Sequence, residues 1–172
     1  MDIADIFVDA FTRIKEGVDA TLEGLGEAEL TFRADAEANS IAWLVWHMTR
    51  VEDDHVCDVA GTEQAWTAEG WFERFGLPFD KAAHGYGHNS EEVAQVKVSA
   101  DLLRGYRAAV SRRTLEFVKG VSAGDLDRVV DRRWDPPVTL GVRLVSVVED
   151  EFQHIGQAAF VRGLVLRRAK SS

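Results

Sequence analysis

Ile41-Ala42-Trp43-Leu44-Val45-Trp46-His47-Met48 is the longest largely apolar run in the chain, and it opens a segment with the marks of a helix. Ser40 precedes the run and is a suitable N-cap, because its hydroxyl can accept from the first free backbone N–H groups. Gly61 marks the end of the segment, since glycine readily adopts the conformation that closes a helix. A helix that is apolar nearly all round is buried on most of its sides. We therefore predict a buried helix over 40–60.

Three further segments repeat apolar residues every three or four positions, which is the spacing of one helix face. They cover about 3–23, 99–119 and 141–168. All prolines fall in the connections, where they interrupt no helix, at Pro78, Pro136 and Pro137. No strand pair is convincing. We therefore predict an all-α protein, an antiparallel four-helix bundle that forms a single domain over 1–172.

A long connection joins the second and third predicted helices, over 61–98. Short helical pieces are expected near 68–75 and 91–96. Trp66 and Trp71 lie in this connection and are candidates to line a pocket. Connections of this length are uncommon in a compact domain and often carry function. Two shorter irregular stretches are expected as well, a connection over 27–39 and one turn at 125–128.

The composition excludes several classes of protein. Of 172 residues, 46% are apolar and 28% are charged, and the formal net charge is −9. Nucleic-acid binders need a basic face, so we expect no nucleic-acid partner. The acidic N-terminus lacks the basic region of a secretory signal, and no apolar run approaches the ~18–20 residues that span a bilayer. Cys57 is the sole cysteine, which fits a reducing compartment. A cytoplasmic protein without a membrane partner is expected.

Two histidines and one carboxylate are the main candidates for a site. Asp150 and His154 are four residues apart on the fourth predicted helix, so their side chains stack on one face and can bind one cation. His47 lies on the buried second helix, and facing helices of a bundle are where metal ligands converge. Each feature alone has a simpler explanation, a hydrogen-bonded core histidine for His47 and a surface ion pair for the other two. Together, two imidazoles and one carboxylate suit zinc, nickel or iron and leave coordination positions open.

Neighbouring acidic residues leave the details of this set open. Glu151 could replace Asp150 as ligand, because it is three residues from His154 on the same helix. Glu149 and Asp54 could accept hydrogen bonds from the imidazole N–H groups that face away from a metal.

The remaining reactive side chains are expected to lie outside the site. His84 and His88 have a chelating spacing, but Gly85 and Gly87 between them disfavour a helix, which leaves a place on the rim or at the mouth of the site. His55 follows His47 by eight residues and is turned about 80° from it. Cys57 follows an acidic run that would raise a thiol pKa, so it is expected to be a small buried residue rather than a nucleophile.

Three motifs carry a resemblance to a known family. The first spans Asn39 to Asp53 and contains the Trp-Leu-Val-Trp-His run, and the second is Glu151-Phe152-Gln153-His154-Ile155-Gly156-Gln157. The third is Gly85-Tyr86-Gly87-His88, followed by Ser90-Glu91-Glu92-Val93. In this order and spacing the chain resembles the DinB-like superfamily, most closely a bacterial branch near mycothiol-dependent maleylpyruvate isomerase.

The resemblance implies a fold, a metal and an assembly. The fold would be a four-helix bundle in up-down-down-up order. The metal would be a divalent ion, commonly zinc or nickel, held by His47, His154 and the residue four positions before the latter. That residue is often His in the superfamily and Glu in the isomerase branch, whereas here it is the shorter Asp150. A homodimer is also expected, from the family tendency and from helix surfaces more apolar than one packing seam requires.

The function that follows from the resemblance is thiol-dependent group transfer. A bound metal would activate a low-molecular-weight thiol, of the mycothiol type, and its thiolate would attack a small electrophile. The thiol is implied by the resemblance alone. The same ligands would also serve a metal-dependent hydrolase, and a non-catalytic bundle that binds a metal or small molecule is the alternative outside enzymes.

Overall fold

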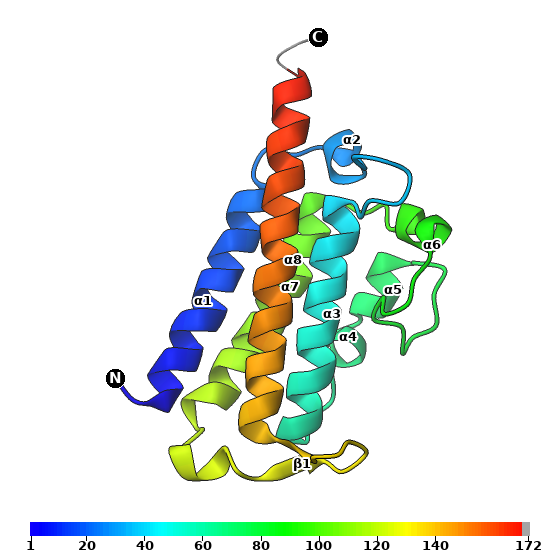
Figure 1. The fold of residues 1–172 in the computed structure, drawn as a ribbon. Helices are drawn as coiled ribbons and strands as arrows, with labels where there is room; N and C mark the ends of the chain where they lie inside the picture. Colours follow the sequence, from blue (N-terminus) through cyan, green and yellow to red (C-terminus); the bar gives the residue numbers. More distant parts are fainter. Residues whose placement is uncertain (170–172) are drawn as a thin grey trace.

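Four long helices dominate the computed structural model, which describes residues 1–169. Within these residues the helices of 20 residues or more are α1 (Ile3–Leu22), α3 (Ile41–Ala60), α7 (Ala100–Lys119) and α8 (Leu140–Ala169). They lie side by side around one core (Figure 1). The prediction of an all-α class is therefore confirmed. The last three residues of the predicted domain over 1–172 lie outside the described part of the chain.

The helix boundaries follow from local capping. Ser40 and Ser99 accept hydrogen bonds from the backbone N–H groups of Trp43 and Leu102, so each serves as N-cap of the helix that follows. Gly61 closes α3 with a φ of 68°, a conformation that side chains disfavour. Both predicted starts and the predicted end of the second helix are thus confirmed.

Helix α3 is buried on most of its sides, as its apolar first half predicts. It packs against α7 and α8, and α1 packs against the same two helices from the other side (Figure 1). Trp46 and Met48 are no more than 1% exposed, and the Trp46 ring also contacts Phe79 and His88 of the long connection, with ring centroids 5.5 and 5.7 Å apart. This packing places α3 and α8 in direct contact, which the sequence pattern could not establish.

The connections contain more helix than predicted. A short helix, α2 (Glu27–Leu30), lies in the first of them. The predicted piece at 68–75 is instead two turns, α4 (Ala65–Ala68) and α5 (Trp71–Phe75), while α6 (Ser90–Gln95) lies close to its predicted range.

The two tryptophans of this connection belong to the core. Trp66 and Trp71 are 2% and 8% exposed, and their rings lie 5.1 and 5.7 Å from the ring of Tyr106. The idea that they line a pocket was wrong, because α4 and α5 fold back and pack their aromatic side chains onto α7.

A short strand pair corrects another expectation. After a single 3-10 turn, η1 (Ala123–Asp125), β1 (Val129–Asp131) pairs antiparallel with β2 (Val138–Thr139). Strands of two or three residues are too short to show the alternation by which a strand is recognised. Asp131 holds this hairpin to α8, since its Oδ2 accepts from Arg143 Nη2 at 3.2 Å.

Among residues 1–169, no helix combines the length and the apolar character needed to cross a bilayer.

Candidate metal centre

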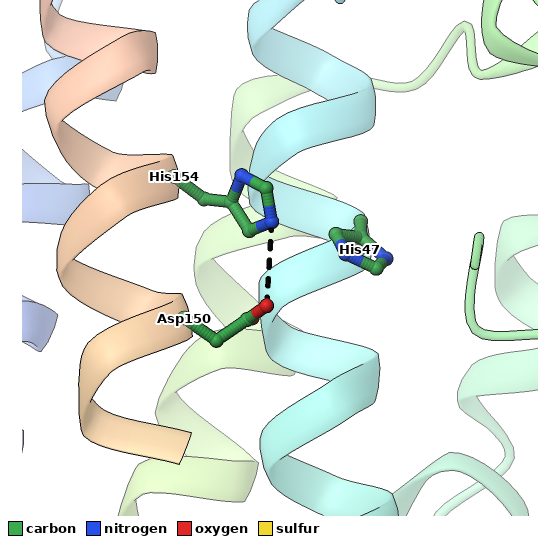
Figure 2. Close-up of side chains that lie close together, drawn as sticks. All are labelled: His47, Asp150 and His154. Carbon is green, nitrogen blue, oxygen red and sulfur yellow. Dashed lines mark ion pairs between the residues drawn. The ribbon is translucent and has the colours of Figure 1, made fainter. Parts of the chain in front are cut away.

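His47, Asp150 and His154, hereafter the triad, meet between α3 and α8 (Figure 2). One potential ligand atom from each residue lies within 4.8 Å of the others. His154 Nε2 is 3.4 Å from Asp150 Oδ1, and the two imidazole rings are 4.8 Å apart. Figure 2 shows His47 on the opposite helix, α3, next to this pair. The structure thus brings together the three residues that the sequence singled out.

Both imidazoles are oriented by acceptors on their Nδ1 atoms. His47 Nδ1 contacts the backbone carbonyl of His84, and His154 Nδ1 lies 3.1 Å from Oε1 of Gln157. A carbonyl or amide oxygen only accepts, so in a neutral ring it holds the proton on Nδ1 and leaves the lone pair on Nε2. This is the arrangement in which histidine binds metals in proteins.

The acceptors are not the carboxylates that the sequence suggested. Asp54 accepts from Gln64 Nε2 at 2.7 Å and lies 3.7 Å from His55 Nδ1, while Glu149 is exposed to solvent. The role proposed for these two residues was therefore wrong. Gln157 could have been found, because it is three residues after His154 on the same helix face. A backbone carbonyl such as that of His84 leaves no signal in the sequence.

Burial and hydrogen bonding set the charge of the triad. Burial lowers the pKa of His47 to about 4, so this ring is neutral at pH 7 and its lone pair is free. Burial also acts to lower the pKa of His154, but its hydrogen bonds to Asp150 and Gln157 outweigh this and the pKa is raised. The second oxygen of Asp150, Oδ2, is buried and has no hydrogen-bond partner among residues 1–169.

Glu151 is turned away from the triad. Its Oε2 accepts from Arg107 Nη1 at 2.7 Å, and Arg107 Nη2 lies 2.6 Å from Glu52 Oε2. All three side chains are completely buried, and we name Glu52, Arg107 and Glu151 the ion cluster. Because successive residues of a helix point about 100° apart, Glu151 cannot reach the histidines while it binds Arg107.

An aromatic wall and a close loop border the triad. The Trp43 ring stacks on His47 with centroids 4.6 Å apart, and its Nε1 lies 3.3 Å from His88 Nδ1. Gly85 passes so close that a Cβ there would lie 2.8 Å from His47 Nδ1. The predicted place of this loop beside the site is thus correct, but neither His84 nor His88 belongs to the triad.

Buried polar contacts from α3 fix the position of this loop. Arg50 Nε donates to the carbonyl of Ala83 at 3.1 Å, one residue before the carbonyl that orients His47. Asp53 accepts from the backbone N–H groups of Ala65 and Trp66 at 2.9 and 2.8 Å, which anchors the start of the connection. His55 instead contacts Arg143, outside the triad as predicted.

A helical bundle in which two packed helices bring together two histidines and one aspartate is the architecture of a DinB-like protein. The family model described as Mycothiol-S-transferase matches residues 7–166, and the chain belongs to this DinB-like family. A conserved protein from Enterococcus faecalis, known from its crystal structure, is similar in fold with a TM-score of 0.89 and 31% identity. The match covers 96% of this chain and 98% of the other. The comparison with curated proteins gave no match.

Proposed function

We propose that this protein is a metal-dependent mycothiol S-transferase, with a divalent ion, zinc or nickel, held by the triad. The observation that carries the proposal is the set of three donors in one place with two of them already oriented by second partners. Family membership supports the thiol as the cosubstrate. The single cysteine and a thiol cosubstrate fit the cytoplasm, which is the location we propose.

The residues present fit a divalent cation. Two imidazole nitrogens and one carboxylate oxygen are ligands that zinc and nickel accept. The buried Oδ2 of Asp150 has no other hydrogen-bond partner in the described chain, so a cation would satisfy a group that is otherwise costly to bury. Asp150 is shorter than the Glu of the isomerase branch, yet its Oδ1 already lies 3.4 Å from His154 Nε2.

When bound, the ion would supply a positive charge that favours the thiolate form of a coordinated thiol near neutral pH. The protein's own groups prepare the place for it. His47 stays neutral at pH 7 because burial lowers its pKa, so no proton competes for its lone pair. Trp43 covers one face of this ring and its edge meets His154, which limits the access of water from that side.

The finer description of the fold belongs to the same proposal. We assign the DinB-like up-down-down-up order to the four long helices. The colours in Figure 1 support it, since the chain rises along α1 and α8 and descends along α3 and α7.

A homodimer is also part of the proposal, with the outer face of α8 as its contact surface. Val145, Phe152 and Phe160 on α8 are 60%, 44% and 66% exposed, which is unusual for large apolar side chains. Sedimentation equilibrium should give about twice 19.1 kDa for the natural chain, and Phe160→Glu should shift it to the monomer. A natural chain that stays monomeric at micromolar concentration would remove the dimer from the proposal.

The central test combines metal analysis with thiol transfer. Protein purified without a metal-affinity tag should contain about one zinc or nickel ion per chain by elemental analysis. It should conjugate mycothiol to monochlorobimane, lose this activity in a chelator and regain it when the ion is restored.

Other outcomes identify the alternatives. Metal-dependent hydrolysis of an ester without any thiol would make the protein a hydrolase. Metal binding and thermal stabilisation by mycothiol without turnover would make it a binding module. The absence of metal from the untagged protein, together with no uptake on titration, would overturn the proposal.

A further inference from the structure

The faces of α3 and α8 that carry the triad continue toward the hairpin end of the bundle. On α8, Arg143 precedes Asp150 by seven residues, and on α3, Asp54 and Asp58 follow His47 by seven and eleven. At about 100° per residue these spacings return each side chain to within about 20° of the same face. Helices α3 and α8 run in opposite directions in Figure 1, so Arg143, Asp54 and Asp58 all lie toward the hairpin end of the bundle.

A pocket lies at that end, about 10 Å from the triad, as seven residues of helix at ~1.5 Å each require. Its volume is about 330 Å³, at the lower end of the range for ligand pockets. Apart from Cys57 its lining side chains are polar, and they include Asp54, His55, Asp58, Gln64, Arg133 and Arg143. It is therefore unlike the aromatic surroundings of the triad, and none of the roles described above uses it.

The formal charges of this lining cancel. Asp54 and Asp58 carry two negative charges, and Arg133 and Arg143 carry two positive charges. Asp131 lies beside the pocket and pairs with both arginines, so an anion such as phosphate would meet the carboxylates of Asp54 and Asp58 without a free positive charge. A hydroxyl both donates and accepts, so an uncharged group with many hydroxyls can use all four side chains.

The donors are held in place before any ligand binds. Asp131 accepts from Arg133 Nε and Nη2 at 3.0 and 2.8 Å and from Arg143 Nη2 at 3.2 Å. Arg143 Nη1 lies 3.0 Å from His55 Nδ1. Arg143 Nε is buried and has no hydrogen-bond partner anywhere in the described residues. Both guanidinium groups are thus held in place by protein partners, which lowers the cost of ordering them when a ligand binds.

We propose that this polar pocket binds the uncharged, hydroxyl-rich end of the low-molecular-weight thiol whose sulfur is used at the triad. The proposal rests on the proposed function, because it assigns the second half of the same cosubstrate. The distance between the triad and the pocket fits this assignment, since a thiol that carries a sugar-like group is long enough to reach both. Selectivity for such a thiol over a simple one would arise in the pocket.

Two half-molecules test the assignment by isothermal titration. N-acetylglucosaminyl-inositol carries the hydroxyl-rich end of mycothiol without sulfur, and N-acetylcysteine carries the thiol without the sugar. The sugar fragment should bind the natural chain whether or not metal is present. Arg143→Lys, which keeps the charge but loses the fork, and Asp58→Asn should each weaken its binding about tenfold. Neither variant should change metal content or the binding of N-acetylcysteine.

Glu116→Gln is the matched control, because it removes a carboxylate from the exposed surface of α7, outside the polar pocket and the triad. It should leave all three measurements unchanged. Asp58 is exposed, so Asp58→Asn keeps the test valid if Arg143→Lys loosens the hairpin.

Failure of this inference and failure of the proposed function are distinguishable. A protein that binds metal and transfers mycothiol, but binds no sugar fragment or binds it equally in the variants, overturns the pocket alone. A protein that binds the fragment through Arg143 and Asp58 but takes up no metal supports the pocket and overturns the proposed S-transferase.

Discussion

The triad and the ion cluster both take residues from α3 and α8, but only the ion cluster includes an arginine, Arg107 from α7. In the ion cluster, Arg107 reaches from α7 and binds a carboxylate from α3 and another from α8, at 2.6 and 2.7 Å. Its side chains are completely enclosed. In the triad the Asp150 carboxylate faces two imidazoles instead of a guanidinium. Buried oxygens without a hydrogen-bond partner in the described chain occur in both places, at Asp150 Oδ2 and at Glu151 Oε1.

The difference shows how adjacent acidic residues acquire separate roles. Asp150 and Glu151 are neighbours in sequence, but their side chains point ~100° apart on the helix. Asp150 therefore faces the histidines of the triad, and Glu151 points into the core. Glu151 meets a guanidinium there, although burial still raises the pKa of this carboxyl well above its usual range. A carboxylate that meets a buried guanidinium is held by the protein itself, whereas one that faces two imidazoles has the surroundings that a metal ligand requires.

The largest effect should come from breaking the ion cluster. Arg107→Met leaves two buried carboxylates without a cation, which typically costs ~3–5 kcal/mol. We expect a loss of that order in the free energy of unfolding, measured in urea. Arg104→Met is the control, because Arg104 is 33% exposed and its ion pair with Asp101 lies at the surface, so the change should cost less than ~1 kcal/mol. Equal effects of the two variants would show that the cluster is not structural.

The next effect concerns the triad and leaves stability largely intact. His47→Gln and His154→Gln should each lower metal affinity ~10–100-fold or more, and the double variant should bind none. Helix content by circular dichroism should hardly change, since neither ring is part of the ion cluster. His84→Gln is the control, because His84 orients His47 through its backbone carbonyl rather than its side chain. Full metal content in the double variant would contradict the triad.

Asp150 and Glu151 allow the triad and the ion cluster to be compared within a single turn of α8. Asp150→Asn should lower metal affinity about tenfold with little change in the urea midpoint. Glu151→Gln should do the opposite, lowering the midpoint with metal affinity nearly unchanged, because it weakens a bond to Arg107. If Glu151→Gln has the larger effect on metal, Glu151 and not Asp150 is the ligand.

The parts that could be predicted from sequence are those with a local physical signal. The periodicity of apolar residues gave the four long helices, and the spacing of Asp150 and His154 placed them on one face. The contact between α3 and α8, which brings His47 to them, depends on tertiary packing and entered only through the family resemblance. The direction of Glu151 could not be predicted, because it is decided by an arginine 44 residues earlier in the chain.

The smallest expected effect tests whether the loop positions the triad. Gly85 has a φ of +94°, and a Cβ there would lie 2.8 Å from His47 Nδ1 and 3.1 Å from the nearest atom of the Trp43 ring. Gly85→Ala should therefore displace the loop or the ring, and we expect metal affinity to fall several-fold, up to about tenfold. The ion cluster lies elsewhere on α3, so its contribution to stability should persist.

Backbone strain must be separated from this steric effect, and Gly87 in the same loop allows it. Its φ is +78°, but a Cβ there would have no atom within 4 Å in the described structure. Both alanine variants should lose about 1 kcal/mol of stability from the unfavourable backbone conformation. Only Gly85→Ala should also weaken metal binding, measured by competition with a chromophoric chelator. If both variants weaken it equally, the loop acts through its overall order, whereas an unchanged affinity in Gly85→Ala would show that the contact with His47 does not position the ring.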